Sequence, residues 1–146
     1  MNQKVIVFWG NGGIGKTTTL NLLIEKLSKI GTMIDGKIAK KPTDNTWAVF
    51  DYNGKRVAVI TVGDDYAILD KYFKKIKTDC DIYVCASRSK GSSVVYIRNR
   101  FANGYIMWQR KWNISEEHGK LNSFSNLIDL LNEKQVEGLI ETINIM

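Results

Sequence analysis

Features that the chain lacks exclude several kinds of protein before any motif is considered. It has only two cysteines, Cys80 and Cys85, and one histidine, His118, so we expect reduced thiols rather than a disulfide framework or a metal centre. No apolar run approaches the roughly 20 residues that cross a bilayer, so no membrane contact is expected. A strand-like stretch begins as early as Lys4, so we expect no signal peptide and a cytoplasmic location.

Prolines and linkers are as scarce as cysteines. Pro42 is the only proline, and no repeat or low-complexity tract divides the 146 residues, which predicts a single domain over residues 1–146. The net charge of +6 favours an anionic partner, either nucleotide phosphates or nucleic acid. Because a nucleotide-binding protein needs positive charge in any case, the charge alone supports nucleic acid only weakly.

The most informative stretch that is present is glycine-rich. Residues 10–17 read Gly-Asn-Gly-Gly-Ile-Gly-Lys-Thr and fit the phosphate-binding pattern G-x-x-x-x-G-K-[ST] at every fixed position. An apolar, β-forming run precedes it at residues 4–9, and apolar residues with helical spacing follow it up to Ile30. A strand, a glycine-rich loop and a helix in this order are the context that the pattern requires.

Each residue type in this stretch has a chemical reason to be there. Glycines let the backbone bring its N–H groups close to phosphate oxygens, and the helix start adds further unpaired N–H groups. Lys16 is expected to reach the β- and γ-phosphates, Thr17 to ligate Mg²⁺ and Thr18 to contact the α-phosphate. The predicted nucleotide-binding residues are Asn11, Gly12, Gly13, Ile14, Gly15, Lys16, Thr17 and Thr18.

Strand and helix signals alternate along the rest of the chain. This order predicts an α/β fold of three layers, with a mostly parallel sheet and helices on both faces. Asn53-Gly54 predicts a tight hairpin, so one pair of strands should be antiparallel. Strands are expected at 4–9, 47–52, 57–62, 81–86 and 105–108, and helices at 16–31, 66–76, 92–103 and within 124–143. An apparent capping box of Asn132 with Gln135 predicts a break or a kink in the last of these helices.

Polar residues at strand ends are the next candidates, because ligands of such sheets lie beyond the carboxyl ends of the strands. Asp64 and Asp65 follow an apolar strand, and at least one of them could hold Mg²⁺ opposite Thr17, with Asp64 preferred; helix capping is the alternative role. Arg88 follows the next strand and is a candidate to stabilise charge on a transferred phosphoryl group, with Arg98 a weaker one. The predicted catalytic residues are Lys16, Asp64, Asp65 and Arg88, and the predicted metal ligands are Thr17 and Asp64.

With these motifs the chain resembles the P-loop NTPases as a superfamily. Residues 10–17 are similar to the Walker A motif, and residues 57–64 to Walker B. The loop is also similar to that of the ATPases related to MinD, ParA and nitrogenase iron protein. That family has a lysine directly after the first glycine, whereas Asn11 stands here, so the resemblance does not carry over the phosphate contact that this lysine makes between subunits.

Two further branches of the superfamily give different expectations. The hairpin before the Walker B-like strand resembles the layout of small GTPases, but their guanine-reading Asn-Lys-x-Asp is absent at Ala86 to Ser89, which favours adenine. Nucleoside and nucleotide kinases bind their acceptor after the first helix, where residues 32–45 look irregular, and have arginines where Arg88, Arg98 and Arg100 fall. No insert is long enough for a full kinase lid.

Three hypotheses follow for the function. The first is a small ATPase that needs ATP, or another nucleoside triphosphate, together with Mg²⁺, and whose hydrolysis is coupled to a protein partner or a second copy of the chain. The second is a kinase that transfers the γ-phosphoryl group to a nucleotide or another small acceptor. The third is a binding module that does not turn its nucleotide over. Asp65, in place of the glutamate that follows Walker B in motor ATPases, leaves the activation of water open, and the residues slightly favour the first hypothesis.

Overall fold

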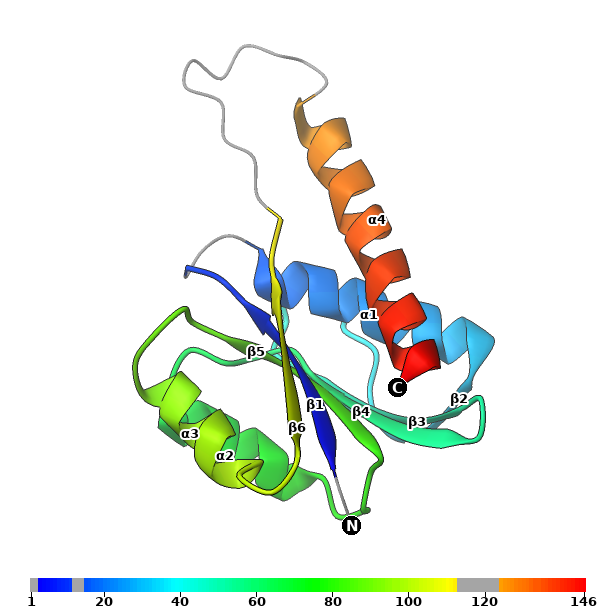
Figure 1. The fold of residues 1–146 in the computed structure, drawn as a ribbon. Coiled ribbons are helices and arrows are strands. Elements are labelled where there is room, and N and C mark those ends of the chain that lie inside the picture. The colour runs from blue at the N-terminus through cyan, green and yellow to red at the C-terminus, as the bar shows by residue number, and fades with distance from the viewer. Residues whose placement is uncertain (1–2, 12–14, 113–123) are drawn as a thin grey trace.

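The protein is seen in a computed structural model that describes residues 3–11, 15–112 and 124–146 (Figure 1). Strands and helices alternate along most of the chain, as the sequence predicts. The strands are β1 (Lys4–Trp9), β2 (Thr32–Gly36), β3 (Trp47–Tyr52), β4 (Lys55–Ile60), β5 (Ile82–Ser87) and β6 (Tyr105–Arg110). The helices are α1 (Lys16–Ile30), α2 (Tyr66–Lys75), α3 (Ser92–Arg100) and α4 (Phe124–Ile145).

The six strands form one sheet in the order β2-β3-β4-β5-β1-β6. β1 pairs in parallel with both β5 and β6, and β4 pairs in parallel with β5, whereas β3 is antiparallel to both of its neighbours. The predicted α/β class, with a mostly parallel sheet and an antiparallel hairpin, is therefore confirmed, and β2 adds a second antiparallel pair that was not predicted. β5 separates β1 from β4, so the two strands that carry the candidate phosphate and metal residues are not neighbours.

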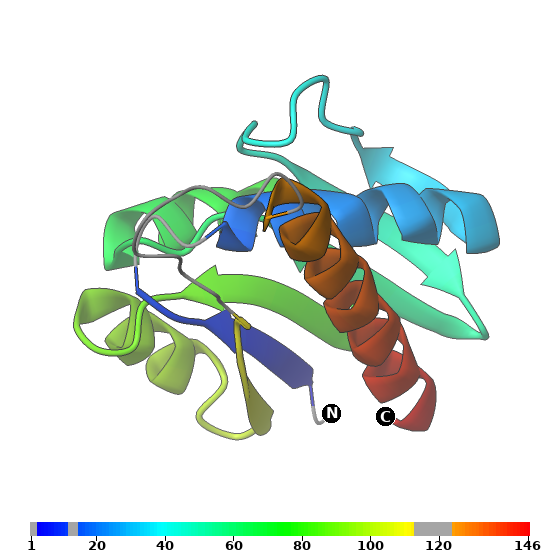
Figure 2. The same ribbon diagram turned by 90° about the horizontal axis from the view of Figure 1, so that it is seen from above.

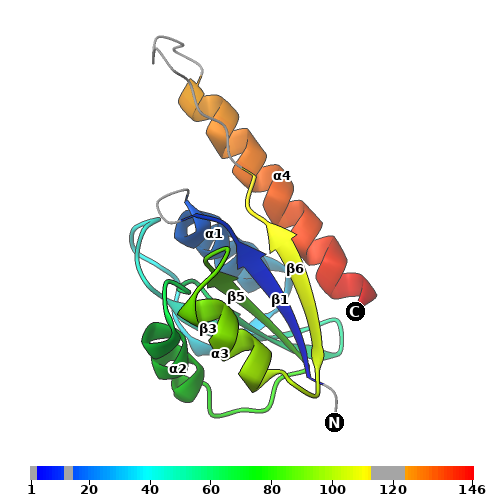
Figure 3. The ribbon, with the colours of Figure 1, turned by 60° about the vertical axis from the view of Figure 1, so that its left-hand side comes forward.

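Helices α1 and α4 lie on one face of the sheet, and α2 and α3 lie on the other (Figures 2 and 3). α1 and α4 pack together over one face around Phe8, Leu23 and Leu139, and α2 and α3 pack over the other around Val7 and Phe73. Every side chain of β5 is buried, as expected for a central strand that is covered on both sides. The three predicted layers are confirmed.

The hairpin between β3 and β4 also forms as the sequence predicts. Asn53 and Gly54 have φ values of 50° and 74°, which is the mirror-image turn that matches the twist of paired strands. Asp51 and Arg56 face each other across the hairpin and form an ion pair of 3.0 Å. β4 ends at Ile60, two residues before the predicted end, because the chain leaves the sheet there to cross its neighbour.

The prediction that residues 32–45 are irregular was wrong for the first part of this range. Thr32–Gly36 forms the edge strand β2, paired with β3 through an irregularity between Met33 and Asp35. Its side chains are mostly exposed, so it carries no apolar alternation from which it could be predicted. Pairing with a neighbouring strand decides its conformation.

The expected break at Asn132 was also wrong, because α4 is one continuous helix over Phe124–Ile145. Asn132 and Gln135 are buried inside it and contact other elements instead of capping a helix. The first turns of α4 extend beyond the sheet, as Figure 1 shows, and Leu127 and Leu130 there stay about half exposed. The apolar residues of these turns therefore need not lie on the same face of the helix as the apolar residues of the later turns, which pack against the sheet. In the described part of the chain, none of the helices has the length and apolar character needed to span a bilayer.

Candidate functional site

The glycine-rich stretch lies at the carboxyl edge of the sheet. Gly10 leaves β1 and donates its N–H to the carbonyl of Ser87, at the end of β5. Gly15 has a φ of 87°, a left-handed conformation that glycine adopts without strain, and α1 begins at the next residue. Residues Gly12, Gly13 and Ile14, which the sequence predicts to bind phosphate, lie outside the described residues.

Lys16 is buried at this edge, with 6% of its surface exposed. Its Nζ donates to the carbonyls of Gly10 at 2.6 Å and Asn11 at 3.0 Å. Burial lowers the pKa of Lys16, the nearby carboxylate of Asp64 raises it, and the guanidinium of Arg88 lowers it. Within the described part of the chain, its ammonium group is hydrogen-bonded only to neutral carbonyl oxygens and is partly desolvated, and a bound anion would compensate this loss of hydration.

The start of α1 adds a second source of positive potential. No side chain caps its first turn, and the turn contains no acidic residue. A helix start in this state has unpaired N–H groups and the positive end of the helix dipole, which favour an anion. Thr17 and Thr18 lie half-buried in this turn, and the hydroxyl of Thr17 donates to the carbonyl of Thr61 at 3.0 Å.

Gly63 brings Asp64 to this place although β5 lies between β1 and β4. After Ile60 the chain crosses the end of β5 so closely that a Cβ on Gly63 would lie 1.8 Å from the carbonyl oxygen of Ala86. Only glycine fits at this crossing. The next residue, Asp64, then lies beside Arg88, with 3.8 Å between Oδ1 and Nε.

The two aspartates at the end of this strand have different roles. Asp65 caps α2, because its Oδ1 accepts the N–H of Ile68 at 2.8 Å. Asp64 makes no such capping bond and pairs with Arg88, and both side chains are more than half exposed. Of the two roles that the sequence leaves open, Asp65 takes the capping one, and Asp64 is the aspartate left to face Lys16.

Arg88 is set in position by a buried pair of serines. The hydroxyls of Ser87 and Ser93 lie 3.0 Å apart, Ser87 donates to the carbonyl of Arg88, and Ser93 accepts its N–H. Gly91 is the residue before α3, and no side-chain hydrogen bond caps this helix start, so neither serine serves as its cap. The serine side chains fix the end of β5 instead.

The other arginines do not join this site. The guanidinium of Arg98 lies over the ring of Trp108, 5.7 Å from its centroid, on the α3 side of β6. Arg100 lies near the opposite edge of the sheet, where it donates to Gln3 at 3.3 Å. The cluster of arginines that a kinase-like site would use is therefore separated in space, and only Arg88 is beside Lys16 and Asp64.

A cavity of about 150 Å³ lies between these residues. Asn45 borders it from the loop that follows β2, and α1 holds this loop, because Asn21 Nδ2 donates to the carbonyls of Pro42 at 2.9 Å and Asp44 at 2.8 Å. The hydrogen bonds from Asn21 thus fix the end of residues 32–45 that borders the cavity. Its other lining residues include Lys16, Thr17, Thr61, Gly63, Asp64, Asp65 and Ala86.

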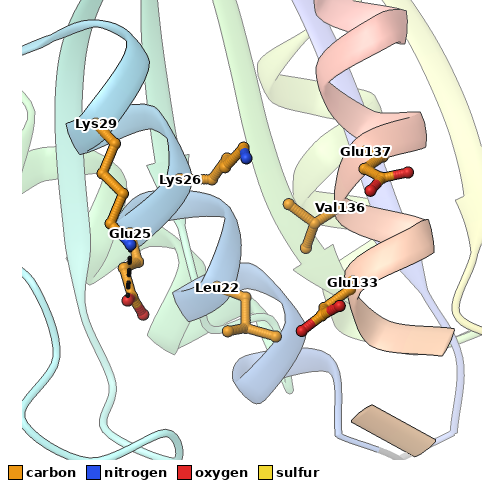
Figure 4. A pocket seen from close by; sticks show the side chains of 7 residues that line it. All are labelled: Leu22, Glu25, Lys26, Lys29, Glu133, Val136 and Glu137. Atoms are coloured by element: carbon orange, nitrogen blue, oxygen red, sulfur yellow. Dashed lines mark ion pairs between the residues drawn. The ribbon is translucent and has the colours of Figure 1, made fainter. Parts of the chain in front are cut away.

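A larger hollow of about 350 Å³ lies elsewhere, between α1 and α4 (Figure 4). Leu22 and Val136 line it together with charged side chains of both signs, including Lys26 and Glu133. Lys29 pairs with Glu25 along the helix surface at 3.6 Å, a spacing typical of solvated helix faces. None of these groups converges on one point, so we assign no chemistry to this hollow.

Lys111 is a residue at the site that sequence reasoning missed. It follows β6, is 5% exposed, and its Cε lies 3.9 Å from where a Cβ on Gly15 would be. Its Nζ donates to Asn132 Oδ1 at 2.9 Å, and Thr19 donates to the same oxygen at 3.2 Å, so this contact joins α4 to α1 and to the end of β6. Burial lowers the pKa of Lys111. In the sequence it looks like any lysine at a strand end.

The donors around the cavity match a hard cation better than a soft one. Thr17 and Asp64 offer oxygen atoms, and Mg²⁺ characteristically takes one or two protein oxygens and completes its shell with water and phosphate. Within residues 3–11, 15–112 and 124–146 no group of three or more His, Cys, Asp or Glu side chains could hold a metal by itself. The two predicted ligands therefore fit a Mg²⁺ that arrives with a phosphate group.

No protein-family model, curated protein or solved structure matches the chain.

Proposed function

We propose that this chain is a P-loop NTPase that binds ATP with Mg²⁺ at residues 10–18 and hydrolyses it. The observation that carries the proposal is Lys16, a partly desolvated ammonium group at the start of an uncapped helix, whose hydrogen-bond acceptors among the described residues are the carbonyls of Gly10 and Asn11. This arrangement favours an anion of high charge. The motif in residues 10–17 makes a triphosphate the best match.

The roles of the residues follow from their positions. Lys16 and the N–H groups of the first turn of α1 would hold the β- and γ-phosphates, and Thr17 and Asp64 would hold Mg²⁺. When bound, Mg²⁺ neutralises charge that develops on the phosphoryl oxygens. Arg88 pairs with Asp64 at 3.8 Å and is free to turn its guanidinium toward the γ-phosphate, because both side chains are largely solvated.

Hydrolysis is favoured over transfer to a small acceptor. The cavity beside Lys16 measures about 150 Å³, which is space for a terminal phosphate group with Mg²⁺ and water but not for a second small molecule, whose pockets commonly span about 300–1,000 Å³. Arg98 and Arg100 lie away from it, so the described residues offer one arginine rather than a cluster to bind a second phosphorylated substrate. Water is the acceptor that fits this space.

The test is to measure phosphate release from ATP with Mg²⁺ by the purified protein, with and without a panel of nucleoside monophosphates. Release without any acceptor supports the proposal. ADP formation that depends on one monophosphate would make the protein a kinase. Neither product, in spite of tight ATP binding, would make it a non-catalytic binding module.

Two variants link the activity to the site. Asp64→Asn should weaken the response to Mg²⁺, with half-maximal activity at a Mg²⁺ concentration roughly tenfold higher. Arg88→Gln should lower the rate without changing ATP affinity. Asp79→Asn, at the opposite edge of the sheet, is the matched control and should change neither. If Asp64→Asn and Asp79→Asn behave alike, Asp64 has no role in metal binding.

A further inference from the structure

The net charge of the chain is concentrated in one continuous stretch. Residues 82–112 contain six cations and no Asp or Glu, whereas the rest of the chain has 15 residues of each sign, so this stretch accounts for the whole net charge of +6. Four of the five arginines and two of the four tryptophans lie in it. It spans β5, α3 and β6, and the two strands flank β1 at one end of the sheet.

The fold turns part of this stretch into a groove between α3 and β6, which lie side by side in Figures 1 and 3. The groove has a volume of about 230 Å³. β6 is the edge strand of the sheet, so no further strand covers its outer side. The residues that line the groove are Trp9, Ser89, Val94, Arg98 and Trp108.

Two tryptophans form the floor of the groove on the same face of the sheet. Trp108 is paired in register with Val7, and Trp9 with Arg110, so the two rings are diagonal neighbours on adjacent strands. Each ring has an arginine over it: Arg98 lies 5.7 Å from the centroid of Trp108, and Arg110 lies 5.4 Å from that of Trp9. Trp108 is 37% exposed although it is a large apolar residue.

We propose that this groove binds single-stranded nucleic acid. The exposed ring of Trp108 and the half-buried ring of Trp9 beside it provide a platform on which bases stack, and the arginines beside them contribute both stacking and contacts to phosphate. Lys90, exposed just after β5 ends, extends the positive surface from the groove toward the carboxyl edge of the sheet. An acidic peptide would use the charge but has no need of two neighbouring tryptophan rings.

The groove is separate from the triphosphate site, although the two are close in the chain. Trp9 directly precedes Gly10, and Arg110 directly precedes Lys111. Binding in the groove needs no nucleotide, so its test is independent of ATP hydrolysis. A failure of one proposal leaves the other unaffected.

The test is fluorescence anisotropy with a labelled oligothymidylate of about 15 nucleotides, near the upper end of the site size of one single-strand-binding domain, without ATP. We expect binding that weakens as salt rises and that quenches tryptophan emission as bases stack. The same strand annealed to its complement should bind more weakly, because its bases are not available for stacking. Polyglutamate of equal charge should compete poorly.

Variants assign the binding to the groove. Trp108→Ala should weaken it at least about fivefold, the smallest effect expected from the loss of one stacked base. Arg98→Gln with Arg110→Gln, two exposed side chains, should lower the salt dependence, each by about 0.7 in the slope of log affinity against log salt. The matched control, Lys37→Gln with Lys40→Gln, removes the same charge near β2, far from the groove in the sheet order.

Each outcome decides the proposal. Preferential binding of the single strand, with losses confined to the groove variants, supports it. No binding at low salt would overturn it, as would equal loss in the Lys37 and Lys40 control. Equal competition by polyglutamate would also overturn it and would indicate an acidic protein partner. Because the arginines are exposed, their variants test the groove even if Trp108→Ala fails to fold.

Discussion

At the scale of single residues, Gly63 determines whether Asp64 can reach the site. Its backbone crosses β5 at a distance that excludes any side chain, since a Cβ would meet Ala86 O at 1.8 Å and its carbon at 2.1 Å. The position of Asp64 beside Arg88 and Lys16 follows from this crossing. The glycine therefore acts on the site through the backbone.

Gly63→Ala should accordingly destabilise the protein. Overpacking of this kind costs about 1–3 kcal/mol, here against main-chain atoms that cannot rotate away. Gly138→Ala is the matched control, because a Cβ there meets nothing within 4 Å and alanine favours the helix by about 0.5–1 kcal/mol. Urea unfolding of both variants measures the difference, and equal stabilities would contradict the close crossing.

Lys16 gives the site a predictable pH dependence. In the protein without nucleotide, burial lowers the pKa of Lys16 below the ordinary lysine value of 10.5, and a bound triphosphate should raise it again. ATP affinity should then be constant at low pH and decline as the pH rises through the lowered pKa, beginning below 10.5. Titration of ATP binding from pH 7 to 10.5 measures this, and a Lys16→Ala variant should lack the decline. A wild-type affinity that rises over this range would contradict the assignment.

The candidate site could be predicted from the sequence only where a motif gives the spacing. Lys16, Thr17 and Asp64 were found because the glycine pattern and a strand followed by acid identify them. Lys111 could not be found, because its burial depends on Asn132, 21 residues later in the chain. Short-range patterns contain no information about such a contact.

At the scale of elements, α4 differs most from what its sequence predicts. Its polar residues Asn132 and Gln135 point inward, and Gln135 donates to the carbonyl of Arg110 at 2.6 Å and accepts the N–H of Trp112 at 2.9 Å. Gln135 thus satisfies backbone groups at the end of β6 that a further strand would otherwise pair with. A capping-box spacing and an inward pair of amides look alike in the sequence, and only tertiary contact separates them.

Asn132→Ala tests this role of α4. It leaves the buried ammonium of Lys111 with one acceptor fewer and should lower the free energy of unfolding by about 1–3 kcal/mol. Lys134→Ala, an exposed residue of the same helix, should stay within about 0.5 kcal/mol of wild type. Thermal or urea unfolding measures both. If the two variants are equally stable, Asn132 is not part of the buried contact.

At the scale of the whole molecule, two helix pairs bury a sheet whose central strands are apolar on both faces. Cys85 lies in the middle of β5, and Cys80 just before it, and both are covered by α2 and α3. The alternation of strands and helices was enough to predict these layers, because each element must bury its apolar side. The exposed edge strand β2 was missed, since it buries little.

The two thiols should report unfolding of the whole molecule. Burial raises the pKa of Cys80 to about 11 and that of Cys85 to about 12. At pH 8 the native protein should therefore react with Ellman's reagent at least about 100-fold more slowly than free cysteine, because only the thiolate reacts. Both thiols should react at once in denaturant. Rapid reaction of either in native buffer would contradict the closed sheet.

The most direct test of the central claim is calorimetric titration of the protein with ATP and Mg²⁺. Wild type should bind one nucleotide per chain, and Lys16→Ala should lose about 10- to 150-fold in affinity, the range expected for hydrogen bonds to a charged group. Lys26→Ala, which removes a charge farther along the same helix in the hollow of Figure 4, should bind as wild type does. If Lys16→Ala binds ATP as tightly as Lys26→Ala, the glycine-rich stretch is not a triphosphate site.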